Sequence, residues 1–148
     1  MKMIILFLLV GSASFTSSLR ARRSVIQFGQ MIECVTPLSA LTDYNGYGCW
    51  CGYGGTGTPL DGTDRCCKTH DECYNALKDS GTCSSWNQIY SESYSFSCYN
   101  CDTPSFAISC GSGTSCAVGL CQCDKTAAEC FSGETFNSAY RNYNKNNC

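Results

Sequence analysis

Fifteen cysteines in a chain of 148 residues constrain the fold of this protein more than any other feature of its sequence. A density of about one cysteine in ten is typical of a domain that folds in an oxidising compartment and is held together by disulfides. The length suits one small domain. We therefore expect a small, disulfide-rich fold in which bridges supply rigidity that the core alone would not.

The amino terminus has the layout of a secretory signal peptide. Lys2 precedes an apolar run from Met3 to Val10, and small residues follow from Gly11 to Ser14. The run is less than half of the roughly 20 apolar residues that span a bilayer. We expect a signal peptide over residues 1–18, with an approximate end, and a secreted, extracellular protein.

A basic cluster, Arg20-Ala21-Arg22-Arg23, stands just before the first globular pattern at Ser24. It is either a charged linker or a dibasic-type cleavage site that ends a short propeptide, residues 19–23, before a mature domain of residues 24–148. Loss of residues 1–23 leaves 6 basic and 12 acidic residues, a net charge of −6. Such a chain is a poor nucleic-acid binder, and contact with a membrane must rest on apolar and aromatic side chains.

Hydrophobic periodicity predicts three helices, over residues 24–34, about 63–78 and about 114–131. The first is amphipathic, with Gln27 on its polar face. Thr63 or Asp64 would cap the second helix, and Gly81 would end it. The fold is thus predicted to be mainly α.

Strict alternation over residues 91–97 predicts a strand that carries Tyr94 and Phe96 on one face. A second short strand is expected around Phe106 and Ile108, which would complete a two-stranded hairpin.

The only histidine of the chain lies in the run Cys66-Cys67-Lys68-Thr69-His70-Asp71-Glu72-Cys73-Tyr74. On a helix, His70, Asp71 and Tyr74 lie within neighbouring turns. A neutral imidazole is a good general base near pH 7, and a carboxylate is a good ligand for a hard cation. Bridges from the flanking cysteines would hold both groups rigidly.

A glycine-rich loop, Tyr47-Gly48-Cys49-Trp50-Cys51-Gly52-Tyr53-Gly54-Gly55, precedes that helix. Glycines let a chain turn so that several carbonyl oxygens point inward. Alone, the loop could be a phosphate cradle or a plain turn. Together with Asp71 on a tethered helix it indicates a calcium site, since Ca²⁺ binds carbonyl and carboxylate oxygens.

Asp124 follows Cys121-Gln122-Cys123. If Cys73 and Cys123 are bonded, Asp124 would lie near His70 and hold one ring nitrogen while the other faces a substrate. Otherwise it is a solvated aspartate on a helix surface. Zinc binding by the cysteines around His70 is disfavoured because a secreted chain would oxidise these thiols. Serine hydrolysis lacks a Gly-X-Ser-X-Gly elbow.

From residue 24 to 148 the chain resembles the secreted, calcium-dependent phospholipases A2, in particular the pancreatic-type branch. The glycine-rich loop looks like the calcium loop of that family, and the run around His70 looks like its active-site helix. The stretch Cys121-X-Cys123-Asp124, followed by Ala127-Ala128 and Cys130, looks like its second long helix. The resemblance implies a short N-terminal helix, a calcium loop, two long antiparallel helices linked by disulfides and a small two-stranded β-wing.

The resemblance also implies roles for individual residues. His70 would be the general base, oriented by Asp124 with hydrogen bonds from Tyr74 and Tyr94. The implied Ca²⁺ ligands are the Asp71 carboxylate and the carbonyl oxygens of Trp50, Gly52 and Gly54. Tyrosine is usual at the Trp50 position, but the ligand there is backbone. The residues matching the acyl channel are Val25, Phe28, Ile32, Tyr44 and Phe131.

The implied reaction is hydrolysis of the sn-2 ester of glycerophospholipids to a fatty acid and a lysophospholipid at a membrane surface or micelle. A tail ending at Arg23 would keep the mature N-terminus from its place near the channel, which implies a zymogen. Candidate membrane contacts are Val25, Ile26, Tyr53 and Tyr90, with Trp86 a weaker one.

The pairing pattern of the family would give seven bridges: Cys34–Cys98, Cys49–Cys148, Cys51–Cys67, Cys66–Cys130, Cys73–Cys123, Cys83–Cys116 and Cys110–Cys121. It leaves Cys101 unpaired, in a stretch between Cys98 and Cys110 that is longer than the usual pattern. Cys101 would be a free thiol or would form an intermolecular bridge.

Two other function classes compete with the enzyme. A non-catalytic binding protein on the same scaffold, such as a receptor ligand or toxin subunit, often lacks the calcium aspartate or the histidine, whereas Asp71 and His70 are both present here. A purely structural disulfide module would leave the His-Asp pair and the glycine-rich loop unexplained.

Overall fold

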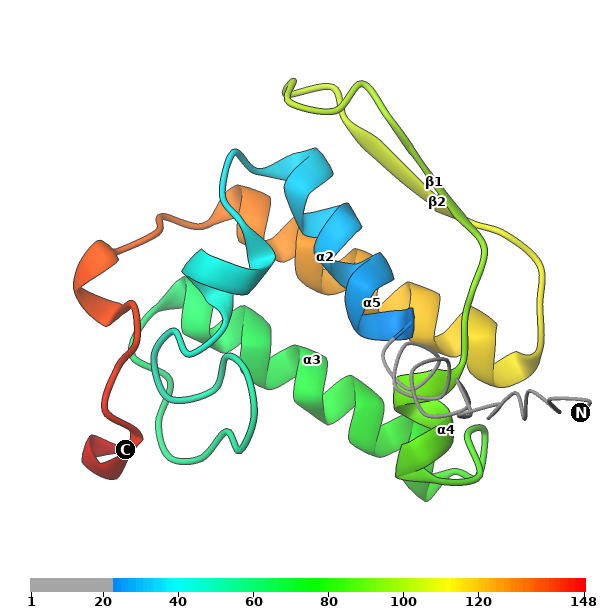
Figure 1. Cartoon of the computed structure of the whole chain (residues 1–148), viewed down its shortest axis with the longest axis horizontal. Coiled ribbons are helices and arrows are strands. Elements are labelled where there is room, and N and C mark those ends of the chain that lie inside the picture. Colours follow the sequence, from blue (N-terminus) through cyan, green and yellow to red (C-terminus); the bar gives the residue numbers. More distant parts are fainter. Residues whose placement is uncertain (1–22) are drawn as a thin grey trace, which may run out of the picture.

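A computed structural model describes residues 23–148 (Figure 1). The elements in chain order are α2 (Arg23–Val35), a π-helix η1 (Ala40–Tyr44), α3 (Gly62–Asp79), α4 (Trp86–Ser91), β1 (Phe96–Tyr99), β2 (Ala107–Cys110), α5 (Ser115–Gly133), and two 3-10 turns, η2 (Ser138–Tyr140) and η3 (Lys145–Asn147). The predicted signal peptide, residues 1–18, and propeptide residues 19–22 lie outside the described residues.

The two long helices, α3 and α5, run antiparallel and side by side, and α2 crosses the other side of α5 (Figure 1). Cys66 and Cys73 of α3 are two turns apart and face Cys130 and Cys123 of α5, which have the same spacing, so two bridges join one face of each helix. Bridges of this kind typically stabilise a domain by about 2–4 kcal/mol each. No helix in residues 23–148 is both long and apolar enough to cross a membrane.

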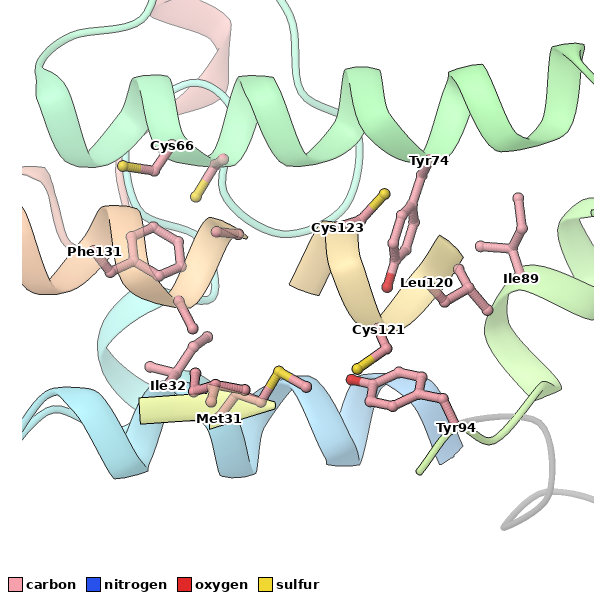
Figure 2. Close-up of a cluster of buried hydrophobic side chains, with 14 of the residues drawn as sticks. Met31, Ile32, Cys66, Tyr74, Ile89, Tyr94, Leu120, Cys121, Cys123 and Phe131 are labelled. Carbon is pink, nitrogen blue, oxygen red and sulfur yellow. The ribbon is translucent and has the colours of Figure 1, made fainter. Parts of the chain in front are cut away.

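The core lies between these three helices (Figure 2). Met31 and Ile32 of α2 pack with Leu120 and Phe131 of α5, and all four side chains are buried. Such burial contributes about 1.5–3 kcal/mol for each large apolar side chain. The helical layout, the two-stranded wing and the disulfide-linked helix pair agree with the fold expected from the sequence.

The N-cap of α3 differs from the prediction. Asp61 caps the helix, and its side chain accepts a hydrogen bond from the Asp64 backbone N–H at 2.8 Å. The expected caps, Thr63 and Asp64, lie inside the first turn and are buried. Tyr47 fixes the choice, because its hydroxyl donates to the second oxygen of Asp61. The helix ends at Asp79, and Gly81 follows with a φ of 75°, which favours glycine.

The strand expected over residues 91–97 is also corrected. β1 begins only at Phe96, and it pairs antiparallel with β2 in the register Phe96↔Cys110 and Cys98↔Ile108. Tyr94 precedes the strand and is buried, while Phe96 is partly exposed. The short helix α4 was not predicted. Ser85 caps it by accepting a hydrogen bond from the Gln88 backbone N–H at 3.1 Å.

Seven disulfides are present among the described residues, and six join the cysteines that the resemblance pairs: Cys49–Cys148, Cys51–Cys67, Cys66–Cys130, Cys73–Cys123, Cys83–Cys116 and Cys110–Cys121. The seventh differs. Cys34 pairs with Cys101, not Cys98, so the free thiol is Cys98 and none is left at Cys101 for an intermolecular bridge.

The turn after β1 explains this exchange of partners. Cys98 lies within the strand, opposite Ile108, whereas Cys101 lies in the turn beyond it. The backbone N–H of Asp102 donates to the Cys34 carbonyl oxygen at 2.9 Å, which brings the Cα atoms of Cys34 and Cys101 to 4.6 Å. The turn between β1 and β2 therefore supplies the cysteine that reaches α2.

Alkylation of the unreduced, denatured protein is expected to label Cys98 and no other cysteine in residues 23–148. Burial raises the pKa of the Cys98 thiol in the folded protein, so native labelling at pH 7 should be slower than labelling in denaturant. Peptide mapping by mass spectrometry reads the result. A labelled Cys101, together with a linked Cys34–Cys98 peptide, would contradict the pairing.

Candidate active site

The His70–Asp124 pair lies between the two long helices. The Nε2 atom of His70 is 2.6 Å from Oδ1 of Asp124, whose side chain is 0% exposed. The Cys73–Cys123 bridge explains this approach, because it joins α3 and α5 one turn from His70 and next to Asp124. The two residues that sequence reasoning linked conditionally are therefore in direct contact.

The imidazole of His70 packs against two aromatic rings. Its ring stacks on Phe28 of α2, with centroids 4.3 Å apart, and lies at the same distance from the ring of Tyr74. With Nε2 bound to Asp124, Nδ1 makes no hydrogen bond to any residue in the 23–148 range. When the Nε2–H donates to Asp124, Nδ1 is a free proton acceptor at the edge of a cavity that His70 lines.

Two tyrosines complete the surroundings of Asp124. The Tyr74 hydroxyl donates to Oδ1 at 2.6 Å, and the Tyr94 hydroxyl donates to Oδ2 at 2.5 Å. Figure 2 shows both phenol oxygens pointing toward the middle of α5. Burial, followed by the negative charge of Asp124, raises the pKa of both phenols well above 10, so both stay protonated donors. Three hydrogen bonds thus compensate for removing this carboxylate from water.

The raised tyrosine pKa values predict a loss of stability at alkaline pH. A group whose pKa is higher in the folded state contributes fully below its unfolded pKa, near 10, and its contribution falls as pH rises above that value. Tyr74 and Tyr94 should each lower the free energy of unfolding by about 1.4 kcal/mol per pH unit above roughly pH 10. Guanidinium unfolding of protein alkylated at Cys98, from pH 8 to 11, measures this. Tyr94→Phe should reduce the slope, and a free energy that stays flat to pH 11 would contradict the account.

Gln27 of α2 positions Tyr94. Its side-chain amide donates to the Tyr94 carbonyl oxygen, and the Tyr94 backbone N–H donates to the Gln27 side-chain oxygen at 3.1 Å. Both polar backbone groups of Tyr94 are thereby engaged, which explains why the alternating segment does not extend β1 to this residue. Gln27 was assigned only to the polar face of its helix, and nothing in the local sequence distinguishes it from its neighbours.

Asp64 shapes the glycine-rich loop. Its carboxylate, which is fully buried, accepts hydrogen bonds from the backbone N–H groups of Cys49, Trp50 and Leu60 at 2.7–2.9 Å. Gly48 has a φ of 56°, and a Cβ there would lie 2.5 Å from the Asp64 carboxyl carbon. The loop can therefore close over Asp64 only with glycine at this position. Sequence reasoning placed Asp64 at a helix cap and missed this function.

The carbonyl oxygens of the loop fall into two groups. Those of Cys51 and Tyr53 accept hydrogen bonds from Lys145 Nζ at 3.2 and 2.9 Å. Within residues 23–148, the alternate carbonyl oxygens, those of Trp50, Gly52 and Gly54, accept none. Gly52 and Gly54 have φ values of 86° and 77°, which only glycine adopts readily.

Asp71 of α3 lies beside the glycine-rich loop. A Cβ on Gly55 would lie 3.0 Å from the Asp71 Oδ2 atom and 3.1 Å from the Trp50 Cα atom. Burial raises the pKa of the Asp71 carboxyl above its ordinary value, although His70 and Lys145 oppose the shift. Asp71 accepts no hydrogen bond from the described residues, so a bound cation would compensate its desolvation.

The donors available here are oxygens, which fits a hard cation such as Ca²⁺. No group of three or more His, Cys, Asp or Glu side chains suited to a metal gathers in residues 23–148. The cysteines considered for zinc, Cys66, Cys67, Cys121 and Cys123, are all in disulfides. These four cysteines therefore offer no free thiolate as a zinc ligand.

A cavity of about 570 Å³ extends from His70 and Asp71 along α2. All five residues predicted for the acyl channel line it: Val25, Phe28, Ile32, Tyr44 and Phe131. The rings of Tyr44 and Phe131 stack with centroids 4.4 Å apart. A largely apolar cavity with an imidazole and a carboxylate in its wall can hold a hydrocarbon chain and place a polar linkage beside those two groups.

Comparison with known proteins finds a matching family model and several relatives. A family model described as Phospholipase A2 matches residues 25–141. The chain is 40% identical over 151 residues to a phospholipase A2 of Bos taurus, covering 100% of both chains. It is 44% identical over 125 residues to a phospholipase A2 of Ovis aries, covering 82% of this chain and 98% of the relative. It is also 43% identical over 118 residues to basic phospholipase A2 1 of Naja sagittifera, covering 80% and 86% of the two chains.

Proposed function

The chain belongs to the phospholipase A2 family, and we propose that it is a secreted, calcium-dependent enzyme that hydrolyses the sn-2 ester of glycerophospholipids. The products are a fatty acid and a lysophospholipid. One observation carries this proposal: His70, which is bonded to Asp124, and Asp71 line the same apolar cavity as Trp50 and Gly52 of the glycine-rich loop. Seven disulfides in the described residues favour an oxidising, extracellular location.

His70 acts as the general base. Its Nδ1 atom takes a proton from a water molecule, whose oxygen attacks the carbonyl carbon of the sn-2 ester. Asp124 holds the ring through Nε2 and stabilises the imidazolium that forms, while Tyr74 and Tyr94 keep Asp124 in place. The proton then passes from Nδ1 to the departing glycerol oxygen as the tetrahedral species collapses, so no covalent enzyme intermediate forms.

Asp71 and the backbone carbonyl groups of Trp50, Gly52 and Gly54 hold Ca²⁺ in this proposal. Two observations support that assignment. These three carbonyl oxygens accept no hydrogen bond from residues 23–148, and the Asp71 carboxylate is partly removed from water. When bound there, Ca²⁺ would supply Lewis-acid polarisation of the ester carbonyl, attraction for the phosphate and compensation of the negative charge that develops on the carbonyl oxygen. Because Trp50 contributes a backbone oxygen, its indole does not disturb the ligand set.

The protein works at a phospholipid membrane surface or micelle. Val25, Ile26 and Leu41 line the cavity and are 50%, 50% and 74% exposed. Exposed apolar side chains at a cavity mouth can enter a lipid interface. The acidic mature chain favours zwitterionic or mixed surfaces over purely anionic ones, since anionic lipids would repel it.

Positional hydrolysis tests the function. Phosphatidylcholine vesicles labelled in either the sn-1 or the sn-2 chain are incubated with the secreted protein, with the propeptide removed, in Ca²⁺ or in excess EGTA. The proposal expects labelled fatty acid only from the sn-2 label and only with Ca²⁺. Equal release from both positions, or no release from folded protein on zwitterionic, mixed and anionic surfaces, would refute it.

A further inference from the structure

We propose that Lys145, near the C-terminus, is a positioning residue for the calcium loop, so that the C-terminal turn is part of the metal site. This inference rests on the proposed function, since it assigns a residue to the Ca²⁺ site described there. Lys145 belongs to η3, about 75 residues from Asp71, and no motif in the sequence connects the two.

Lys145 binds two of the loop carbonyl groups and leaves those between and after them free. Its Nζ atom binds the carbonyl oxygens of Cys51 and Tyr53, which leaves those of Gly52 and Gly54, at alternate positions, without a donor in residues 23–148. The Cys51 oxygen also accepts from the Gly46 backbone N–H at 3.2 Å. A single ammonium thus fixes the peptide planes between the proposed ligands, and it does so without occupying a ligand oxygen.

The segment that carries Lys145 is itself fixed to the loop. The Cys49–Cys148 bridge joins the last residue to the glycine-rich loop, and the Tyr143 backbone N–H donates to the Gly46 carbonyl oxygen at 3.0 Å. A Cβ on Gly57 would lie 2.3 Å from the Cys148 carbonyl oxygen, so the chains are in close contact there too. In Figure 1 the C-terminal turn lies beside this loop. The backbone that carries Lys145 is therefore held close to the loop.

Lys145 can affect Ca²⁺ in two opposite ways. Its positive charge repels a cation, and this effect alone would make Ca²⁺ bind more tightly when the charge is removed. Its hydrogen bonds hold the loop in one conformation before the ion arrives, and their loss would make Ca²⁺ bind more weakly. Hydrogen bonds to a charged group are strong, whereas repulsion between partly exposed charges is screened by solvent and salt. The positioning effect therefore dominates.

Calcium affinity of Lys145 variants tests the inference. Isothermal titration with CaCl₂ should show Ca²⁺ binding roughly three- to tenfold more weakly to Lys145→Met than to the wild type. Lys145→Arg keeps the charge and the N–H donors and should recover most of the loss. Lys78→Met makes the same charge change at the end of α3 and should bind Ca²⁺ within about twofold of the wild type.

Hydrogen exchange of the loop amides without Ca²⁺ provides the second readout. The amides of Gly46 and Cys51, which donate to the Cys51 and Tyr47 carbonyl oxygens, should exchange faster in Lys145→Met than in the wild type, while those of α3 and α5 stay unchanged. Unchanged exchange in the loop, or Ca²⁺ binding to Lys145→Met as tight as or tighter than to the wild type, would overturn the inference and leave the proposed function standing. A wild-type protein that binds no Ca²⁺ would instead refute the proposed function, and the inference with it.

Discussion

Replacing His70 with glutamine should lower kcat for sn-2 hydrolysis by about 10³- to 10⁴-fold, the upper part of the range for a general base. Glutamine keeps an N–H donor that can face Asp124 but offers no nitrogen that accepts a proton near pH 7. The Ca²⁺ affinity should change little, because His70 is not a proposed ligand. Stopped assays on phosphatidylcholine vesicles give the rate, and calorimetry gives the affinity.

Tyr74→Phe and Tyr94→Phe are the matched controls for His70→Gln. Each removes one of the three hydrogen bonds to Asp124 and leaves His70 in contact with it. Their rates should therefore fall far less than that of His70→Gln. If His70→Gln retained a rate within tenfold of the wild type while folding normally, another residue would have to activate the water.

Replacing Asp71 with asparagine should abolish the stabilisation that Ca²⁺ gives and reduce hydrolysis by roughly 10³-fold or more, since a Lewis-acid metal supplies several kcal/mol. Wild-type protein at a Ca²⁺ concentration 100 times its Kd should gain about 2.7 kcal/mol in unfolding free energy, whereas Asp71→Asn should gain none. Thermal unfolding in EGTA and in CaCl₂ compares the two proteins.

The behaviour without Ca²⁺ separates this effect from simple misfolding. Burial raises the pKa of Asp71, so its charge at pH 7 costs stability in the folded protein, and the neutral amide removes that cost. In EGTA, Asp71→Asn should therefore be at least as stable as the wild type. A variant that is much less stable in EGTA, or one that Ca²⁺ still stabilises fully, would contradict the assignment.

The residues that sequence predicted well share short spacing or strong periodicity. The structure has α2, α3 and α5 within one or two residues of the expected ranges, because their apolar positions recur at helical spacing. His70, Asp71 and Tyr74 lie on one helix, so their proximity follows from that helix alone. The contact with Asp124, 54 residues away, needed the Cys73–Cys123 pairing, which only the family resemblance supplied.

The errors concern contacts between distant segments. Asp61 and Asp64 are equally good caps by residue type. In the structure Tyr47 holds Asp61 at the cap, whereas the carboxylate of Asp64 is engaged by backbone N–H groups of the loop. The sequence does alternate around Tyr94, but the Gln27 side-chain amide makes hydrogen bonds with the N–H and the carbonyl oxygen of Tyr94, so these groups do not pair with another strand. The partner of Cys34 depends on a turn whose geometry the sequence does not specify.

The most direct test of the account is a calcium titration in which site occupancy and hydrolysis are measured on one preparation. Calorimetry follows binding of Ca²⁺, and release of fatty acid from sn-2-labelled phosphatidylcholine gives the initial rate on vesicles of fixed composition. The account predicts that the rate rises in proportion to occupancy from no detectable release in EGTA, and that Asp71→Asn shows neither binding nor release. Release that persists in EGTA, or a filled site with no release from any lipid surface, would contradict it.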